Sequence, residues 1–380
     1  MIGVTGILNS LPLNFPTEFP ENSGNMLHGD VPFRMFNESY LAINRNWPNY
    51  KSGDRFKDFV NNSCTHVIIT CANMFRANDS SPSMRARYKK LEEMLSGYDK
   101  PVVLFGLGVQ AKEQKLDGLE FPPEAISAMQ AIADRAHAVS VRGEFTKSVL
   151  EKFGNAKNVF VTGCPSFFSV PSAFKELHEN VNSFKGKSKL RSAFSGTYYN
   201  RESEMSLMTD VIRSRTYLIE PQNKENYEFY KSVVDNPGLA KVPGHFEYLV
   251  DGNNPIIQRE ELVSYFSNRF KLFRDLKPWD EFNREFIDFT YGTRFHVNMS
   301  SLLSGKPALW LTHDSRTREL ADTLCLPNLD LVQAGRMSQV EIIESVNYDP
   351  LFENLDFMFD RFNEFLIAAE LPIISKIGLP

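Results

Sequence analysis

The feature that most constrains the fold of this chain is the regular alternation of short apolar runs with helical patterns. In the first half, five runs have the length and composition of buried strands: residues 2–8, 65–70, 102–105, 138–141 and 159–161. Helical patterns lie between them, at residues 84–96, 124–135 and 144–153. Strands that alternate with helices are typical of parallel sheets covered by helices.

A second alternating set follows a polar, Lys-rich region, Ser169–Lys189, which we interpret as a linker. Its strand-like runs are residues 190–195, 216–219, 270–273, 286–290, 308–311 and 330–332. Helical patterns separate these runs at residues 201–214, 225–234, 259–267, 297–304 and 316–324, and an amphipathic segment follows at 355–369. The pattern predicts an α/β fold of two Rossmann-like domains facing a cleft, at residues 1–180 and 190–350. Residues 351–380 are expected to form a C-terminal helix and tail that pack back on the first domain.

Composition excludes several classes of partner. The net charge of −5 gives no general attraction to nucleic acid or to an anionic membrane. No apolar run approaches the roughly 18–20 residues that span a bilayer, and the first residues read as a strand instead of a signal peptide. The four cysteines have neither CxxC nor metal-ligand spacing. We therefore expect a reduced, cytoplasmic protein with no transmembrane segment, no metal site and no nucleic-acid partner.

The strongest site signal follows the apolar run at residues 286–290. Gly292 and Thr293 permit a tight turn there, and Arg294 and His296 stand just before a helical pattern. A histidine at a helix N-terminus lies where backbone N–H groups favour an anion. The same pattern would arise from a helix-capping histidine beside a surface arginine.

Two more arginines follow strand-like runs. Arg316 comes after the run at residues 308–311 and falls in the first turn of a helix, where the helix dipole disfavours a cation unless an anion is bound. Arg142 ends the run at residues 138–141 in the first half. The carboxyl ends of strands in an open α/β sheet are where ligands bind, so these arginines indicate an anionic ligand between the halves. Solvated surface arginines are the alternative.

Weaker candidates line the same predicted cleft. Gly106 and Gly108 follow a strand-like run and would let a ligand approach closely, with Gln110 beside them. A lone GxG lacks the rest of the dinucleotide fingerprint, so a nicotinamide cofactor is rejected. Asn25, in a polar turn after the first run, would lie on the acceptor side or in an ordinary loop. Cys164 shows no partner that would make it a nucleophile and is expected to be buried.

These residues carry a resemblance to a known family. The segments Val139–Gly154, Val161–Phe168 and, above all, Gly292–Pro327 resemble the polysaccharide pyruvyl transferase family, as do the shorter segments Phe105–Gln110 and Asn22–Asn25. The resemblance implies an architecture like that of GT-B glycosyltransferases. It also implies transfer of the carbon skeleton of phosphoenolpyruvate to a sugar as a pyruvate ketal, with Arg142, His296 and Arg316 contacting phosphoenolpyruvate. Many relatives carry Lys where this chain has Arg316.

The chemistry suits these residues. Phosphoenolpyruvate carries a phosphate and a carboxylate, which Arg142, Arg294 and Arg316 could bind. We hypothesise that His296 is the acid/base, because histidine titrates near neutral pH. Phosphoenolpyruvate acts as the donor substrate, and no cofactor is expected. The sugar acceptor would be nucleotide-linked or lipid-linked. A lipid-linked acceptor would place the protein at the inner membrane face, with the basic helix Met84–Lys100 as a candidate for peripheral contact.

Two other functions fit parts of the pattern. A GT-B-like glycosyltransferase that uses a nucleotide sugar would also need arginines for the diphosphate. A non-catalytic protein that binds glycans or anions would use the same groups without releasing phosphate.

Overall fold

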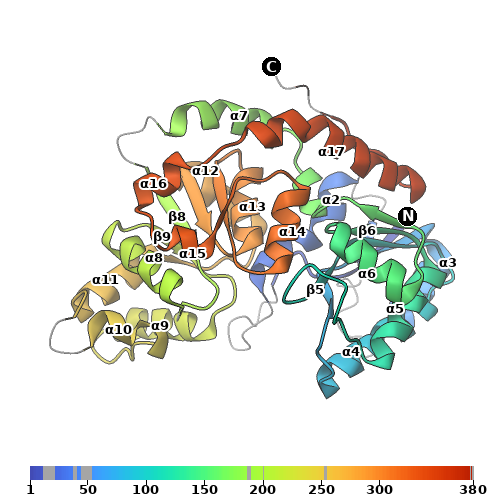
Figure 1. Ribbon diagram of the computed structural model, residues 1–380, viewed down its shortest axis with the longest axis horizontal. Helices are drawn as coiled ribbons and strands as arrows, with labels where there is room; N and C mark the ends of the chain where they lie inside the picture. Colours follow the sequence, from blue (N-terminus) through green and yellow to red (C-terminus); the bar gives the residue numbers. More distant parts are fainter. Residues whose placement is uncertain are drawn as a thin grey trace.

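The computed structural model describes residues 1–11, 22–36, 41–43, 54–185, 190–199, 201–251, 255–376 and 378. Figure 1 shows two α/β halves side by side, with two long helices, α7 (Ala173–Phe184) and α17 (Asp349–Ala368), along the upper edge. Each half contains one parallel sheet. The predicted fold class, α/β with two Rossmann-like, GT-B-like halves, is confirmed.

The first sheet has the order β2-β1-β3-β5-β6-β7, and β4 pairs with β5 outside this path. Its strands are β1 (Ile2–Gly6), β2 (Leu41–Ile43), β3 (His66–Thr70), β4 (Asn73–Arg76), β5 (Val102–Gln110), β6 (Ala136–Val141) and β7 (Val159–Val161). The accompanying helices are η1 (Ser23–Asn25), α1 (Met26–Gly29), α2 (Val31–Met35), α3 (Asp54–Ser63), α4 (Pro82–Ser96), α5 (Pro123–Arg135), α6 (Glu144–Gly154) and η4 (Pro165–Phe168).

The second sheet has the order β10-β9-β8-β11-β12-β13, which is the Rossmann order 3-2-1-4-5-6. Its strands are β8 (Ser192–Ser195), β9 (Tyr217–Ile219), β10 (Phe270–Lys271), β11 (Phe289–Gly292), β12 (Ala308–Thr312) and β13 (Asn328–Asp330). Its helices, besides α7 and α17, are α8 (Glu202–Arg213), α9 (Lys224–Asp235), η5 (Gly244–Phe246), α10 (Glu247–Val250), α11 (Arg259–Arg269), α12 (Leu276–Phe286), α13 (Phe295–Leu303), α14 (Ser315–Thr323), α15 (Leu331–Ala334) and α16 (Gln339–Glu344). The strand order reverses between β8 and β11, so their carboxyl ends form the ligand-binding crevice expected of such sheets.

The core of the molecule joins the two halves. One face of the first sheet packs with α3 to α6 in a separate cluster, whereas the other face belongs to the same apolar cluster as the second half. Helix α17 makes this connection: Phe362 and Phe365 lie 6.3 Å and 5.3 Å, centroid to centroid, from Phe105 of β5. Phe168 of η4 stacks on Phe362 at 4.3 Å.

Several predicted elements differ from the structure. The region interpreted as a linker contains α7, whose amphipathic pattern was hidden by its polar face. Gly106 and Gly108 lie inside β5 and not after it, because the strand continues through an irregular register opposite β6. Helix α6 extends one residue beyond the predicted pattern, to Gly154, and Asn155, in a left-handed conformation, caps its C-terminus. Residues 276–286, to which no helix was assigned, form α12, and β11 begins at Phe289 instead of Phe286.

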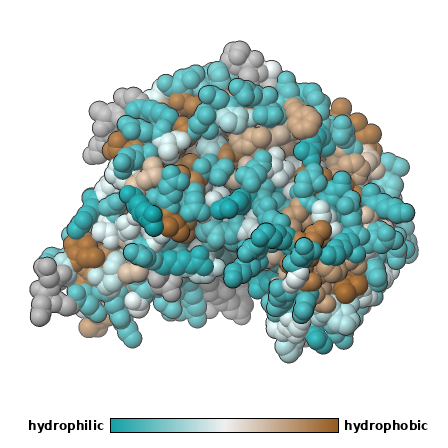
Figure 2. All heavy atoms as spheres, in the orientation of Figure 1, coloured by the Kyte–Doolittle hydropathy of each residue, from teal (hydrophilic) through white to brown (hydrophobic). Residues whose placement is uncertain are grey.

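Among the residues that the structure describes, no helix has both the length and the apolar character needed to cross a bilayer. Figure 2 shows a mainly hydrophilic face on which apolar atoms form small, separate patches. The basic face of α4 is partly neutralised, since Arg85 and Lys89 lie 3.9 Å and 3.8 Å from the carboxylate of Glu124.

Candidate functional site

The turn after β11 is shaped by contact with the neighbouring strand. Gly292 has a φ of +147°, and a Cβ atom there would lie 2.2 Å from the carbonyl oxygen of Ser195. Only glycine fits this position, because other residues rarely adopt that φ and would collide with β8. The turn brings Arg294 to the N-cap position of α13 and His296 into the first turn. Both therefore lie at the reversal point of the second sheet.

Arg294 is held against the loop that follows β8. Its Nε donates to the carbonyl oxygen of Gly196 at 2.9 Å, and its Nη1 donates to Oε1 of Gln222 at 2.9 Å. Its Nη2 lies 3.4 Å from the carbonyl oxygen of Thr197. Thr293, buried next to it, shares a 2.7 Å hydroxyl contact with Thr197. Both residues thus join the turn after β11 to the loop after β8.

Glu204 organises the same loop and was missed by the sequence analysis. Its fully buried carboxylate accepts backbone N–H bonds from Thr197, Tyr198 and Tyr199 at 2.7, 3.0 and 3.2 Å. The hydroxyl of Thr293 donates to the same carboxylate at 3.2 Å. A carboxylate with four donors is a strongly preorganised anchor. Nothing in the local sequence separates it from a first-turn helix glutamate.

Arg142 is buried at the end of β6, with 4% of its surface exposed. Its Nε donates to the carbonyl oxygen of Gly106 at 3.0 Å, and its Nη1 donates to Oδ1 of Asn73 at 2.9 Å. Gly108 makes room for it, because a Cβ atom there would lie 2.7 Å from Cδ of Arg142. Burial lowers the pKa of the Arg142 guanidinium from its ordinary value. Gly108 therefore makes room for Arg142, whereas Gly106 makes room for His28, whose Cε1 would lie 2.5 Å from a Cβ atom there.

His296 lies in a buried cluster with two residues from the first half. Its Nε2 is 3.4 Å from Sγ of Cys164, and that sulfur is 3.7 Å from Nδ1 of His28. Ser166 Oγ lies 3.0 Å from the same sulfur. Cys164 and His28 are fully buried, and His296 is 8% exposed. The predicted burial of Cys164 is confirmed, but its two histidine neighbours lie more than a hundred residues away in sequence and gave no signal.

The electrostatics of this cluster favour neutral imidazoles. Burial, followed by the charge of Arg142, lowers the pKa of His28 to about 3. Burial also holds the pKa of His296 well below its ordinary value, and His28, Arg142 and Arg316 lower it further. Burial raises the pKa of the Cys164 thiol, against the opposing effect of Arg142. An anion bound beside these groups would stabilise a protonated His296.

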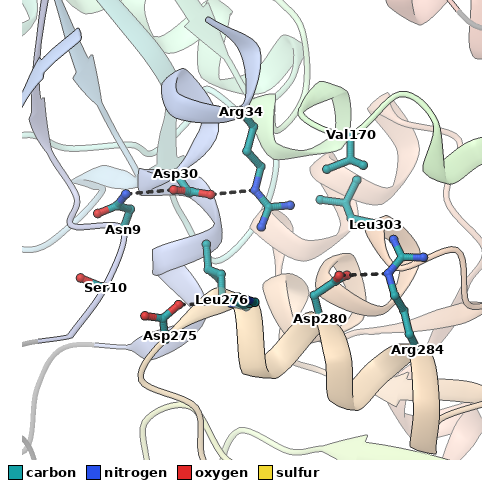
Figure 3. Close-up of a pocket in the computed structure, with 11 residues that line it drawn as sticks. Asn9, Ser10, Asp30, Arg34, Val170, Asp275, Leu276, Asp280, Arg284 and Leu303 are labelled. Atoms are coloured by element: carbon teal, nitrogen blue, oxygen red, sulfur yellow. Dashed lines mark hydrogen bonds and ion pairs between the residues drawn. The ribbon is translucent and has the colours of Figure 1, made fainter. Parts of the chain in front are cut away.

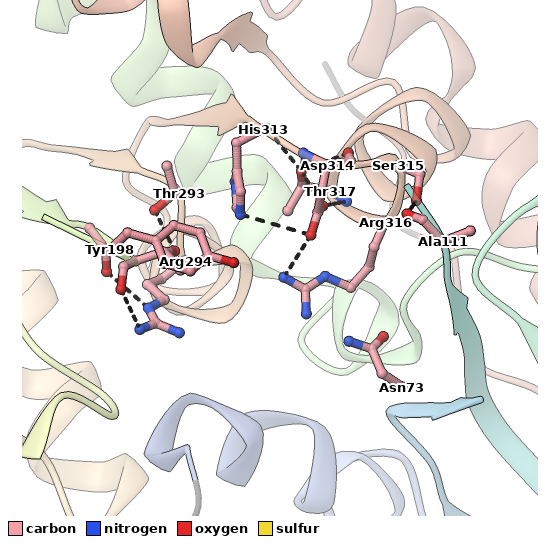
Figure 4. Close-up of polar contacts among 12 residues, drawn as sticks. Asn73, Ala111, Tyr198, Thr293, Arg294, His313, Asp314, Ser315, Arg316 and Thr317 are labelled. Carbon is pink, nitrogen blue, oxygen red and sulfur yellow. Dashed lines mark hydrogen bonds and ion pairs between the residues drawn. The ribbon is translucent and has the colours of Figure 1, made fainter. Parts of the chain in front are cut away.

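Arg316 lies in the first turn of α14, on the second half's side of the site. Its Nη2 contacts Oδ2 of Asp314 at 3.3 Å, and Asp314 is the N-cap of this helix in a reciprocal capping box with Thr317. Arg316, Asp314 and the adjacent His313 are drawn in Figure 4, together with Asn73 of the first half. The side chain of Arg316 is 28% exposed and so is accessible to a ligand.

Direct contacts hold the halves together next to Arg316. Oγ of Ser315 donates to the carbonyl oxygen of Ala111 at 2.6 Å, and Nε2 of Gln114 donates to the carbonyl oxygen of Ser315 at 2.7 Å. Glu319 accepts from the backbone N–H and the hydroxyl of Thr146 at 2.8 and 3.0 Å. These contacts fix α14 against the first half, and with it the position of Arg316.

The remaining predicted residues fall into two groups. Asn25 ends η1, a segment that packs against α13, the helix of His296. Gln110 lies at the far end of β5, where it pairs with Arg76 of β4. The structure thus brings Arg142, His296 and Arg316 into one electrostatic neighbourhood, with Gly106 and Gly108 beneath Arg142. It directs Arg294, Thr293 and Gly292 toward the loop after β8.

A cavity of about 470 Å³ lies between the halves, and neither Arg142, His296 nor Arg316 lines it. Figure 3 shows Asp30 and Arg34 on one side of it and Asp280 and Arg284 on the other. Each pair is an ion pair, with nitrogen–oxygen distances of 2.7 Å and 2.9 Å. Each arginine of this cavity is paired with an aspartate, and Lys277 also lines it.

Comparison with known proteins gives one family and several distant structures. A family model described as polysaccharide pyruvyl transferase matches residues 22–315. No curated protein matches the chain.

Similar solved structures include the S. aureus MnaA–UDP co-structure, with a TM-score of 0.44 and 11% identity over 99% of each chain. UDP-GlcNAc 2-epimerase from Neisseria meningitidis bound to UDP-GlcNAc gives a TM-score of 0.43 and 11% identity over 98% of this chain and 94% of that one. Anabaena Alr3699/HepE in complex with UDP and glucose gives a TM-score of 0.42 and 8% identity over 97% of this chain and 96% of that one. At these scores the structures carry no argument about the ligand of this chain.

Proposed function

Since the chain belongs to the polysaccharide pyruvyl transferase family, we propose that it transfers the pyruvyl group of phosphoenolpyruvate to two hydroxyls of a sugar. The product would be a pyruvate ketal, and phosphate would be released. The observation that carries this proposal is the grouping of Arg142, Arg316 and His296 where the two halves meet. Two cationic groups on opposite halves suit a small donor with an anionic group at each end.

In this proposal the arginines bind the donor and His296 moves the proton. The buried guanidinium of Arg142 keeps N–H groups for a bidentate anion contact besides those used on Gly106 and Asn73. Arg316 approaches from α14, and Asp314 orients it. Arg294 fixes the loop after β8, and we propose that it also assists in charge stabilisation.

The proposed reaction begins when His296, protonated next to the bound anion, gives a proton to the methylene carbon of the donor. The central carbon then gains oxocarbenium character, and a sugar hydroxyl attacks it. Phosphate leaves, and a second hydroxyl of the same sugar closes the ketal. The arginines stabilise the carboxylate and the departing phosphate. The two hydroxyls release two protons as they attack; one restores protonated His296, and the other leaves with the phosphate.

We propose a polysaccharide or its precursor as the acceptor and the cytoplasm as the place of action. For a lipid-linked acceptor the reaction would take place at the inner membrane face. Helix α4 has exposed basic residues that could approach anionic lipid headgroups there, although Glu124 neutralises part of this face.

The test is phosphate release from phosphoenolpyruvate with acceptors that contain galactose, glucose, mannose or N-acetylmannosamine. We expect acceptor-dependent release that is lost in His296→Ala and Arg142→Ala, and kept in His137→Ala, which removes an exposed histidine of the first half. Thermal unfolding of each variant separates lost activity from lost folding. Absence of release with every acceptor, together with stabilisation by a nucleotide sugar and not by phosphoenolpyruvate, would favour a glycosyltransferase. Stabilisation by phosphoenolpyruvate or glycan without release would favour a binding protein.

A further inference from the structure

The cluster around Cys164 has the composition of a metal site. One ligand atom from each of His28, Cys164 and His296 lies within 4.8 Å of the others. The three residues come from α1, from the segment before η4 and from α13, and all are buried. Neutral imidazole and thiolate are the ligands that zinc prefers in proteins. The absence of a metal site was expected from sequence spacing, which cannot detect ligands brought together by the fold.

Two of the three ligand separations fit a tetrahedral cation site, and the third, between the two histidine nitrogens, is within 4.8 Å. Zinc binds sulfur at about 2.3 Å and imidazole nitrogen at about 2.0–2.1 Å, so tetrahedral geometry places the two ligand atoms about 3.6 Å apart. In the structure the Cys164 sulfur is 3.4 Å from Nε2 of His296 and 3.7 Å from Nδ1 of His28. The two observed separations lie on either side of the tetrahedral one.

The orientation of His28 is also that of a ligand. Its Nε2 lies 3.0 Å from the carbonyl oxygen of Phe105. A carbonyl oxygen only accepts, so Nε2 must carry the hydrogen, and Nδ1 presents a lone pair toward the Cys164 sulfur. Metal-binding histidines are commonly fixed by such a hydrogen bond from the other ring nitrogen. Phe105 lies in the middle of β5, which makes this support rigid.

The positive groups nearby set a cost for binding. Arg142 is buried next to the cluster, where its charge acts on Cys164 and on both histidines. A dication is repelled by this guanidinium. Loss of the thiol proton on binding adds one negative charge at Cys164 and offsets part of the repulsion. The remaining positive charge would favour an anion or a hydroxide at the open fourth position.

We propose that His28, Cys164 and His296 form a three-ligand site for one Zn²⁺ or a similar soft divalent cation, and that its occupation inhibits the enzyme. A cation bound to Nε2 of His296 keeps that nitrogen from exchanging a proton with substrate. The proposal of inhibition rests on the proposed function, whereas the proposal of cation binding does not.

Cobalt titration of the full chain tests the proposed cation binding. Protein is stripped with a chelator and titrated with Co²⁺, and the charge-transfer absorption between thiolate and cobalt is followed. We expect one Co²⁺ per chain, loss of this band in Cys164→Ser, and a dissociation constant raised at least about tenfold in His28→Asn. Cys325→Ser is the matched control, because this free, partly exposed cysteine lies outside the cluster.

Zn²⁺ competition against bound Co²⁺ then shows whether zinc uses the same ligands. Near-ultraviolet circular dichroism and thermal unfolding establish that each variant is folded. A wild-type chain without the thiolate band would overturn the site. So would a folded Cys164→Ser variant that keeps the band, since the sulfur would then not be a ligand.

Turnover measurements distinguish failure of this inference from failure of the proposed function. We expect the stripped protein to release phosphate in the presence of acceptor, Zn²⁺ to stop this release, and chelator to restore it. Full activity at saturating bound Zn²⁺ would overturn inhibition and leave the metal site. A protein that binds Co²⁺ through Cys164 but transfers pyruvyl to no acceptor would overturn the proposed function, and with it the proposed inhibition.

Discussion

The strand ends of the two sheets both carry arginines, yet these arginines are held in different ways. Arg142, on the first sheet, is buried and bonded to a strand carbonyl and to Asn73. Arg294, on the second sheet, is half-buried and bonded mainly to the loop after β8. The first arrangement creates a fixed charge inside the molecule, and the second connects two turns. An arginine directly after a strand can therefore be either a buried charge or a link between two turns.

We call the carboxyl ends of the strands in the first and second sheets the first and second rims. The two rims also differ in how they stabilise charge. On the first rim, Arg142 lies among a thiol and two neutral histidines, and the carboxylate of Glu319 offsets part of its positive charge. On the second rim, the carboxylates of Glu204 and Asp314 already balance local donors. Ligand binding should therefore depend more on Arg142 than on Arg294, and loop stability should depend more on the second rim.

The largest effect is expected for Arg142→Lys. Lysine keeps the charge but loses the planar fork that contacts Gly106 and Asn73 and can still grip an anion. We expect kcat/KM for phosphoenolpyruvate to fall by about 10²–10³-fold, as for loss of a preorganised charge-stabilising donor. Steady-state phosphate release measures this, and a wild-type value in the folded variant would contradict the role.

Glu204→Gln should cost the second rim its anchor. The amide retains one acceptor oxygen where the carboxylate serves four donors, so buried N–H groups of the loop lose partners. The free energy of unfolding should fall by about 1–3 kcal/mol. Denaturant titration tests this, with Glu202→Gln on the same helix as an exposed control. Equal stability of the two variants would show that the loop does not need the charge.

Arg294→Lys should have a smaller effect that is divided between folding and turnover. The substitution removes the Nε bond to Gly196 and leaves the chain one amine for the contacts of two other nitrogens. We expect stability to fall by about 1 kcal/mol and activity by about tenfold. Parallel melting and turnover curves measure the two effects. A loss of activity as large as that of Arg142→Lys, without any change in stability, would erase the contrast between the rims.

The smallest effect concerns pH. Burial lowers the pKa of His313, whose side chain is 3% exposed, so the native state resists a proton that the unfolded chain accepts below about pH 6.5. This histidine therefore costs stability as the pH falls below that value and costs nothing above it. His313→Phe should flatten the decline of the unfolding free energy between about pH 6.5 and 5 by at most about 1.4 kcal/mol per pH unit. An unchanged slope would mean that His313 titrates normally.

The sequence predicted the fold class because periodicity and strand-like runs are local properties. Most strands of both sheets and most long helices were placed from these runs. His296 was correctly placed near a helix N-terminus, and Arg316 in the first turn of a helix. The helix α12 was missed because Pro278 and its bulky aromatic residues weaken a helical pattern, although its buried face is well defined. The continuation of β5 was missed because Gly106, with a φ of +73°, reads as a turn.

The parts of the site that were missed depend on contacts across the fold. Glu204 acts on a loop before its own helix and on Thr293 from another strand. His28 and Cys164 meet His296 only after two halves of the chain have packed together. Residue type and spacing do not predict contacts between distant segments, whereas an arginine directly after a strand-like run can be placed at the end of that strand from sequence alone.

Helix α17 gives the molecule an order of assembly. During synthesis the first sheet leaves the ribosome long before Phe362 and Phe365, the residues that cover Phe105. Until they arrive, one apolar face of that sheet is covered only in part, and such a surface invites aggregation or a chaperone. A chain cut before Asp349 should accordingly expose this face permanently, although it would retain every residue of the proposed site.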